Sequence, residues 1–365
     1  MLKNLKHSIV FILIVITLLF VIVMSLAASK PVPNINTAAV SAQNGNESKY
    51  GKWHGLGMGL YWEQESYVES LLANGFTELR IDIPNYQATN WLSHSKTMII
   101  RTIAKGAKVI WGVSSNARNN PDYTITAANW PTYRQAILDN AQWAQDNGVF
   151  EFQLGNEEES HNDNITLTDA QLIENLKSVA TDVQAIFTRG KVSYSCPHDY
   201  IDDWIAEGKG DIDILASNVY MGGTTFNDTW KTVITSLVNA FGADGTYLTE
   251  FNLSYSGLDY YSKDETLQAA ALTEMIEYIK ASGITRAFYF CYQSDKFGAL
   301  KNDGTYRLLW NQALLNTGPA KFATIPTKTT TISLPDIIAL IPKITRIAPN
   351  PASGSTVTLT LQCRK

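Results

Sequence analysis

Short apolar runs alternate with amphipathic stretches from about residue 54 to about residue 316 of the chain. Each apolar run is rich in β-branched and aromatic residues and stops at a turn signal, which is typical of a buried strand. The stretches between the runs repeat their apolar residues at helical spacing. The eight predicted strands lie near residues 54–61, 77–83, 107–113, 149–154, 191–196, 212–218, 246–251 and 284–291.

The ends of several intervening helices are also visible in the sequence. Thr168 and Asp264 each open a stretch with helical periodicity, as expected at the start of a helix. Glycines follow several of these stretches, where a left-handed residue commonly ends a helix before the next strand. These glycines are Gly75, Gly106, Gly148, Gly190 and Gly283.

The strict alternation of strands and helices predicts an α/β protein with a parallel sheet. Eight such units close the sheet into a (β/α)8 barrel, the TIM barrel, which we expect to occupy residues 53–318. The structural alternative is a doubly wound open sheet. No glycine-rich phosphate loop follows the first predicted strand, so the barrel is favoured.

The sequence on either side of this region has a different character. Basic residues precede an apolar run within residues 1–28, which we interpret as a secretory signal peptide or an uncleaved membrane anchor. Residues 29–52, rich in Pro, Asn, Ala, Ser and Gly, are expected to form a flexible linker. Residues 319–365 form a Thr- and Pro-rich tail, or the start of a truncated C-terminal β-domain. The protein is therefore expected to be secreted to the extracellular side, or to be anchored there in the membrane.

Charge and cysteine content narrow the class of ligand. The formal net charge of −5 and the absence of clustered Lys and Arg beyond the N-terminus argue against a nucleic-acid partner. Cys196, Cys291 and Cys363 have neither metal-ligand spacing nor the pattern of a disulfide framework. We expect a monomer that binds a neutral or weakly charged ligand and uses no cofactor and no metal.

Two glutamates stand near the ends of predicted strands, Glu157 after the fourth strand and Glu250 in the seventh. In a (β/α)8 barrel the carboxyl ends of all strands meet at one face, where the active site is built. Hydrolysis of a glycosidic bond with retention of configuration needs two carboxyl groups about 5 Å apart, one as acid/base and one as nucleophile. The pair is suited to these two roles.

Together with three further residues, this pair resembles the catalytic set of clan A of the glycoside hydrolases, which are retaining (β/α)8 enzymes. The resemblance covers residues 54–316 and implies that Glu157 is the acid/base and Glu250 the nucleophile. It also implies that Asn156 contacts the substrate 2-hydroxyl group, that Arg80 lies beside the nucleophile, and that Tyr220 is the sixth-strand tyrosine.

Within the clan, the segment 248–255 is most similar to the nucleophile segment of family 39, and family 5 is nearly as similar. The chain departs from the clan pattern at four places, one of which is the end of the third strand, where Ser114-Ser115-Asn116 lacks the histidines of family 5. Glu158 stands where proline usually follows the Asn-Glu pair, Cys291-Tyr292 where an indole usually floors the sugar site, and Asn218 where family 5 has histidine.

Aromatic side chains on the loops at the carboxyl face are candidate sugar-stacking residues, because sugar rings present flat C–H faces. The aromatic candidates are Tyr61, Trp62, Trp111, Tyr255 and Tyr292, and Asn116 is a polar candidate at the end of the third strand. The sequence thus predicts an exported retaining β-glycoside hydrolase whose substrate is a β-linked polysaccharide or its oligosaccharides. The alternative is a non-catalytic carbohydrate-binding barrel.

Overall fold

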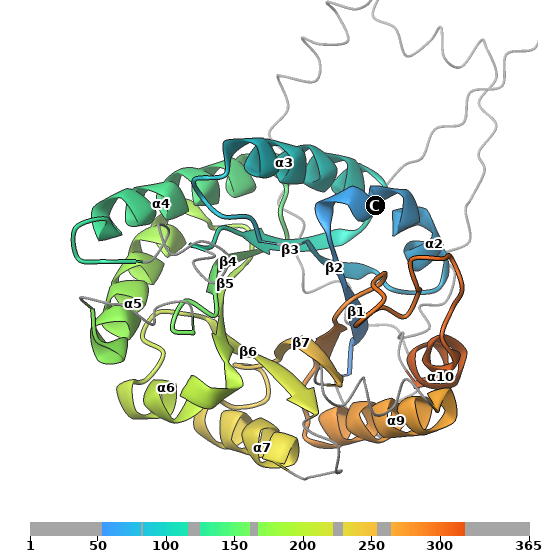
Figure 1. Cartoon of the computed structure of the whole chain (residues 1–365). Helices are drawn as coiled ribbons and strands as arrows, with labels where there is room; N and C mark the ends of the chain where they lie inside the picture. Colours follow the sequence, from blue (N-terminus) through green and yellow to red (C-terminus); the bar gives the residue numbers. More distant parts are fainter. Residues whose placement is uncertain are drawn as a thin grey trace, which may run out of the picture. The chain divides into compact units, whose positions relative to one another are not determined.

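The computed structural model describes residues 53–81, 83–115, 125–160, 167–221, 229–253 and 264–317. In this part of the chain eight parallel strands pair in sequence order and the first pairs with the last, so the sheet is a closed barrel (Figure 1). The predicted TIM barrel is confirmed and the open sheet is excluded. The strands are β1 Gly55–Leu60, β2 Glu78–Ile81, β3 Lys108–Gly112, β4 Glu151–Asn156, β5 Lys191–Pro197, β6 Ile214–Met221, β7 Leu248–Leu253 and β8 Arg286–Tyr289.

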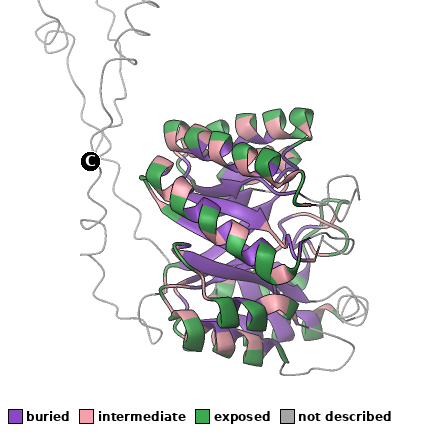
Figure 2. Ribbon diagram, turned by 90° about the vertical axis from the view of Figure 1, so that its left-hand side faces the viewer, coloured by how far each residue is buried: buried purple, intermediate pink, exposed green. Residues whose placement is uncertain are grey.

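Helices surround the barrel as an outer ring (Figure 1). The helices are η2 Trp62–Tyr67, α2 Val68–Ala73, α3 Thr89–Ala104, α4 Trp130–Asn147, α5 Asp169–Ile186, η5 His198–Tyr200, α6 Ile201–Glu207, α7 Thr229–Phe241, α9 Glu265–Ala281, η6 Trp310–Leu314 and α10 Leu315–Thr317. In side view most strand residues are buried, while the helices expose their outer faces to solvent (Figure 2). This pattern is the amphipathicity that the sequence periodicity predicts.

The predicted helix starts are confirmed. The Thr168 side chain caps α5 by accepting from the Gln171 N–H at 3.3 Å, and the Asp264 side chain caps α9. Four of the five predicted glycines have positive φ, but Gly190 does not. A Cβ atom on Gly190 would lie 2.0 Å from the Phe150 carbonyl oxygen, so this glycine permits a close backbone approach instead.

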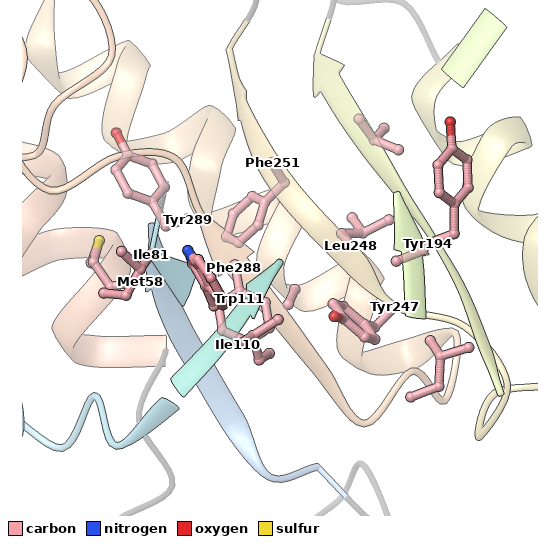
Figure 3. Close-up of a cluster of buried hydrophobic side chains, with 14 of the residues drawn as sticks. Met58, Ile81, Ile110, Trp111, Tyr194, Tyr247, Leu248, Phe251, Phe288 and Tyr289 are labelled. Atoms are coloured by element: carbon pink, nitrogen blue, oxygen red, sulfur yellow. The ribbon is translucent and has the colours of Figure 1, made fainter. Parts of the chain in front are cut away.

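Strand residues alternate between the barrel interior and the layer under the helices. Phe152 and Trp111 point outward, and their rings lie 5.9 Å from Phe187 and 5.1 Å from Trp143 respectively. Figure 3 shows buried apolar side chains of the barrel strands, among them Trp111 of the outward layer and Phe288, which shares the inward parity of Arg286. The interior residues come from the other parity of each strand, which places polar side chains inside the barrel.

A buried charged layer lies inside the barrel at the amino ends of the strands. Arg286 of β8 pairs with Glu151 of β4 and, at 3.2 Å, with Glu78 of β2. Tyr247 donates to Glu151 at 2.5 Å. Because every charge in this layer has a partner of opposite sign, removing one member would leave an uncompensated buried charge, at a cost of about 3–5 kcal/mol.

The strand register is irregular where the barrel nears its carboxyl face. On β4 the pairing to β5 shifts between Gln153 and Asn156, and on β7 the pairing to β8 shifts between Leu248 and Phe251. Such irregularities re-aim side chains next to functional sites. They occur on β7, which carries Glu250, and on β4, which ends directly before Glu157.

Three predicted segments lie outside the described residues: the signal or anchor at 1–28, the linker at 29–52 and the tail at 319–365. Among the helices that the structure describes, none combines the length and the apolar character needed to cross a bilayer.

Candidate active site

Glu250 is held by two donors at the mouth of the barrel. Its Oε1 atom accepts from Arg80 Nη1 at 2.8 Å, and its Oε2 atom accepts from the Tyr220 hydroxyl. The glutamate is only 9% exposed. Both carboxylate oxygens therefore have a hydrogen-bond donor, one a cation and the other a phenol.

Arg80 of β2 donates hydrogen bonds to three different side chains. Besides the ion pair with Glu250, its Nε donates to Gln153 Oε1 at 2.9 Å and its Nη2 donates to Asn156 Oδ1 at 2.7 Å. A planar guanidinium can serve three acceptors in fixed directions, which an ammonium cannot. Arg80 thus ties β7 to two positions on β4.

Asn218 of β6 continues this connection to Glu157. Its Nδ2 group donates to Asn156 Oδ1 at 3.2 Å and to Glu157 Oε1 at 2.9 Å. Its Oδ1 atom accepts from the hydroxyls of Ser195 at 3.0 Å and Thr249 at 2.9 Å. Since hydroxyl donors occupy the oxygen, the amide nitrogen must face Glu157.

Glu157 has an unusual backbone conformation. With φ of 55° it is the single non-glycine residue with positive φ in the part of the chain that the structure describes. Its N–H donates to the Ser195 carbonyl at 2.8 Å. A left-handed conformation costs an L-residue roughly 1–2 kcal/mol, and such residues cluster at active sites.

Tyr220 remains a hydrogen-bond donor over the physiological pH range. Burial, followed by the negative charge of Glu250, raises the pKa of Tyr220 well above its usual value. The phenol therefore stays protonated and donates to the carboxylate.

These contacts bring five predicted residues into one network. It runs from Glu250 through Arg80 to Asn156, and then through Asn218 to Glu157, with Tyr220 on the far side of Glu250. The network can support one carboxylate as a nucleophile and a second as a proton donor and acceptor, which is the pairing that glycoside hydrolysis requires.

Two of the predicted stacking residues are not at the barrel mouth. Trp111 is fully buried, and its Nε1 atom donates to Ser95 of α3 at 2.9 Å. Tyr292 is 1% exposed and shares a hydrogen bond of 2.6 Å with the Tyr306 hydroxyl. The prediction of sugar contacts for both was wrong, because each ring is buried against side chains of neighbouring elements and cannot stack on a sugar.

The other candidates have different outcomes. Tyr61 and Trp62 are partly exposed after β1, where the Tyr61 ring meets Phe290 edge-on at 5.7 Å and the Trp62 ring lies 4.9 Å from His94. Their role in sugar binding stays a prediction. Asn116 and Tyr255 lie outside the described residues.

Some residues of the site were not anticipated. Phe290 directly follows β8, one position before the predicted Cys291-Tyr292, and its ring lies 5.9 Å from Phe297. Gln153 lies two positions after Glu151 on β4, so both side chains point into the barrel. Alternation along the strand could have predicted this orientation. Phe297 lies on an irregular loop, and nothing in its local sequence identified it.

The acidic triplet 157–159 also differs from a solvated loop. Glu158 and Glu159 are 0% and 1% exposed, and both carboxylates accept hydrogen bonds from other elements.

The described residues contain no group of three or more His, Cys, Asp and Glu side chains that could hold a metal ion. Cys196 and Cys291 are buried, and neither forms a disulfide.

Comparison with known proteins identifies the fold. No protein-family model and no curated protein matches the sequence. A GH10 endoxylanase retrieved from a sugarcane soil metagenome superposes with a TM-score of 0.54 at 11% identity, over 73% of this chain and 97% of that one. The likeness supports the (β/α)8 barrel fold.

Two other solved structures agree. A family 5 xyloglucanase from Paenibacillus pabuli, in complex with a ligand, has a TM-score of 0.51 at 14% identity and covers 73% of this chain and 98% of its own. A GH10 protein from Paenibacillus barcinonensis has a TM-score of 0.53 at 12% identity, with coverages of 74% and 97%. At these identities the likeness extends to the fold, and the finer resemblance to family 39 stays a prediction.

Proposed function

We propose that this protein is a retaining β-glycoside hydrolase that cleaves O-glycosidic bonds of a polysaccharide or its oligosaccharides by double displacement. The observation that carries the proposal is the continuous hydrogen-bond network from Glu250 through Arg80, Asn156 and Asn218 to Glu157. It joins the two carboxylates that the mechanism needs and supports each in a different way.

In the first step, Glu250 attacks the anomeric carbon while Glu157 gives its proton to the departing glycosidic oxygen. The C–O bond to the leaving group breaks, and a glycosyl ester with Glu250 forms. The Arg80 guanidinium and the Tyr220 phenol hold the nucleophile by its two oxygens, which limits its freedom before attack.

In the second step, Glu157 takes a proton from water, and the resulting hydroxide attacks the anomeric carbon. The ester bond breaks, Glu250 is regenerated as a carboxylate, and the sugar leaves with its original configuration. Asn218 donates to Glu157 at 2.9 Å and orients it for both proton transfers.

Asn156 is oriented for substrate recognition. Its Oδ1 atom accepts from Arg80 at 2.7 Å and from Asn218 at 3.2 Å. With the oxygen held by two donors, the Nδ2 group is the end of the amide that serves as a donor to an acceptor such as a sugar hydroxyl.

Two measurements test the proposal. The protein is first screened on aryl β-glycosides and on β-glucans, mannans and xylans at several pH values. Proton NMR of the first product then reports its anomeric form, which we expect to be retained. Binding without turnover on every substrate would favour the alternative, a carbohydrate-binding barrel, and an inverted product would exclude Glu250 as the nucleophile.

We further propose that the protein is exported. Lys3, Lys6 and the apolar run that follows them support this proposal. Immunoblotting of medium, membrane and cytoplasmic fractions tests it, and full retention in the cytoplasm would contradict it.

A further inference from the structure

Glu158 is a buried carboxylate held by neutral donors. It is 0% exposed, and it accepts from the Ser115 N–H at 3.2 Å, the Ser115 hydroxyl, the Tyr133 hydroxyl at 2.8 Å and the Asn156 N–H at 3.2 Å. Burying a carboxylate costs several kcal/mol, which these hydrogen bonds must offset. The donors come from three parts of the fold: the end of β3, helix α4 and the end of β4.

Gly155 makes room for this carboxylate. A Cβ atom at Gly155 would lie 2.8 Å from Glu158 Oε1 and 3.2 Å from the Tyr133 hydroxyl. Both contacts are closer than ordinary van der Waals separation. A side chain at position 155 would collide with the Glu158 carboxylate. The buried position of Glu158 therefore depends on the glycine three residues before it.

Three consecutive backbone amides are fixed around Glu157. The Asn156 N–H donates to the Glu158 carboxylate at 3.2 Å, and the Glu157 N–H donates to the Ser195 carbonyl at 2.8 Å. The Glu158 N–H donates to the Tyr194 hydroxyl at 3.1 Å. With φ of 55° at Glu157, the chain needs such contacts to keep this turn in a single conformation.

The electrostatics of Tyr133 agree with a permanent role as donor. Burial, followed by the charge of Glu158, raises the pKa of Tyr133 well above its usual range, so its hydroxyl keeps its proton. The donors that hold the Glu158 carboxylate therefore keep their protons near neutral pH.

We infer that Glu158 is a positioning residue, which holds Asn156 and Glu157 in the geometry that proton transfer to the leaving group requires. The inference rests on the proposed function. Glu158 touches no reacting atom and acts through the backbone of its two predecessors. Glu158 occupies the position at which the resemblance leads one to expect proline. In this chain the hydrogen-bonded carboxylate, and not a proline ring, restricts the conformation of the turn.

The test uses two substrates that differ in their need for protonation. A dinitrophenyl glycoside has a good leaving group that departs with little proton donation, whereas a phenyl glycoside depends on the acid. We expect Glu158→Gln to lower kcat/KM for the phenyl glycoside about ten- to a hundredfold and to leave that for the dinitrophenyl glycoside within about threefold. Gly155→Ala, which displaces the carboxylate without removing it, should show the same selective loss.

Glu159→Gln is the matched control. Its carboxylate is also buried in this turn, but it accepts from Tyr194 and Trp204 at 2.6 Å each and not from Asn156. This variant should keep the wild-type ratio of kcat/KM between the two substrates. Thermal unfolding of all variants records any general loss of stability.

The results separate this inference from the proposed function. Equal losses on both substrates in Glu158→Gln and Gly155→Ala, or no loss on either, would overturn the positioning role while wild-type turnover keeps the proposed function. If the wild-type protein hydrolyses no glycoside, the proposed function fails and the positioning role fails with it.

Discussion

Arg80 Nη1 lies 2.8 Å from Glu250 Oε1, so a buried ion pair joins the second and the seventh strands across the mouth of the barrel. The side chains are 3% and 11% exposed, which limits screening of the pair by solvent. Because the same guanidinium also holds Gln153 and Asn156, the pair orients both sides of the site at once.

Replacing Arg80 by lysine should therefore damage activity although the charge is kept. A single ammonium group cannot reach Glu250, Gln153 and Asn156 together, so kcat/KM should fall by roughly a hundredfold or more. Steady-state kinetics on an aryl glycoside checks this. Arg101→Lys is the control, because Arg101 is 61% exposed in its pair with Glu65 and should matter little. Wild-type kcat/KM in Arg80→Lys would refute this role of Arg80 as a donor to three side chains.

Tyr220→Phe should lower kcat by about ten- to a hundredfold, since Glu250 loses one of its two donors. Burial raises the pKa of Tyr220 well above its usual range, so the hydroxyl stays protonated throughout the working range. The ratio of wild-type to variant activity should then be constant from about pH 7 to about pH 9, the interval in which ionisation of an ordinary tyrosine would begin. A ratio that changes with pH in this interval would contradict the assignment of Tyr220 as a permanent donor.

The two glutamates should respond differently to removal. Glu250→Ala should abolish turnover even of activated substrates, because no glycosyl ester can form, and azide should restore some activity with an inverted product. Glu157→Ala should spare the first step for a good leaving group, slow the second step, and be rescued by azide to a product of retained configuration. Product analysis by NMR reads both outcomes, and the reverse pattern would exchange the two roles.

Asn218→Asp should lower activity strongly, although the two side chains have nearly the same size and shape. The aspartate oxygen would replace the amide donor that faces Glu157 Oε1 at 2.9 Å and Asn156 Oδ1 at 3.2 Å, placing acceptor against acceptor. We expect kcat/KM for a phenyl glycoside to fall about a hundredfold. Asn302→Asp is a suitable control because Asn302 lies on an exposed turn. Equal activity of the two variants would show that Asn218 does not orient the acid/base.

Glu159 should make stability depend on pH. Burial raises its pKa from 4.5 to about 7, so the folded state binds this proton more tightly than the unfolded state. Between these two values the unfolded chain is ionised while the folded protein keeps its proton. The contribution of this group is therefore full below about pH 4.5 and is lost as pH rises to about 7, by up to about 3 kcal/mol.

Glu159→Gln removes this titration, because glutamine carries no ionisable proton. The free energy of unfolding of the variant, measured relative to that of the wild type in denaturant series, should rise steadily from about pH 4.5 to about pH 7 and level off above. A difference that is flat across this interval would show that Glu159 is ionised in the folded protein near pH 5.

The sequence by itself determined the class of fold. Strand and helix periodicities are local properties, and eight alternating units leave the closed parallel barrel as the favoured arrangement. It also indicated Glu157 and Glu250, because residues at the carboxyl ends of barrel strands share one face whatever the loops do. Arg80, Asn156 and Tyr220 could be recognised on the same basis, from strand position together with the resemblance.

Only the tertiary structure decided which aromatic side chains reach that face. Trp111 and Tyr292 looked equivalent to Tyr61 in sequence, yet their rings are buried against neighbouring elements. One residue of register turns a strand side chain from the barrel mouth to the layer under the helices, and apolar periodicity cannot distinguish these two buried environments.

The same limit explains Glu158, which local sequence presents as part of an acidic, solvated loop. Its carboxylate is stable in the interior because Ser115 and Tyr133, distant in sequence, supply donors at the right place. Hydrogen bonds between residues far apart along the chain depend on how the elements pack, and a single sequence does not specify those distances. The catalytic candidates thus follow from strand order, whereas their support follows from packing.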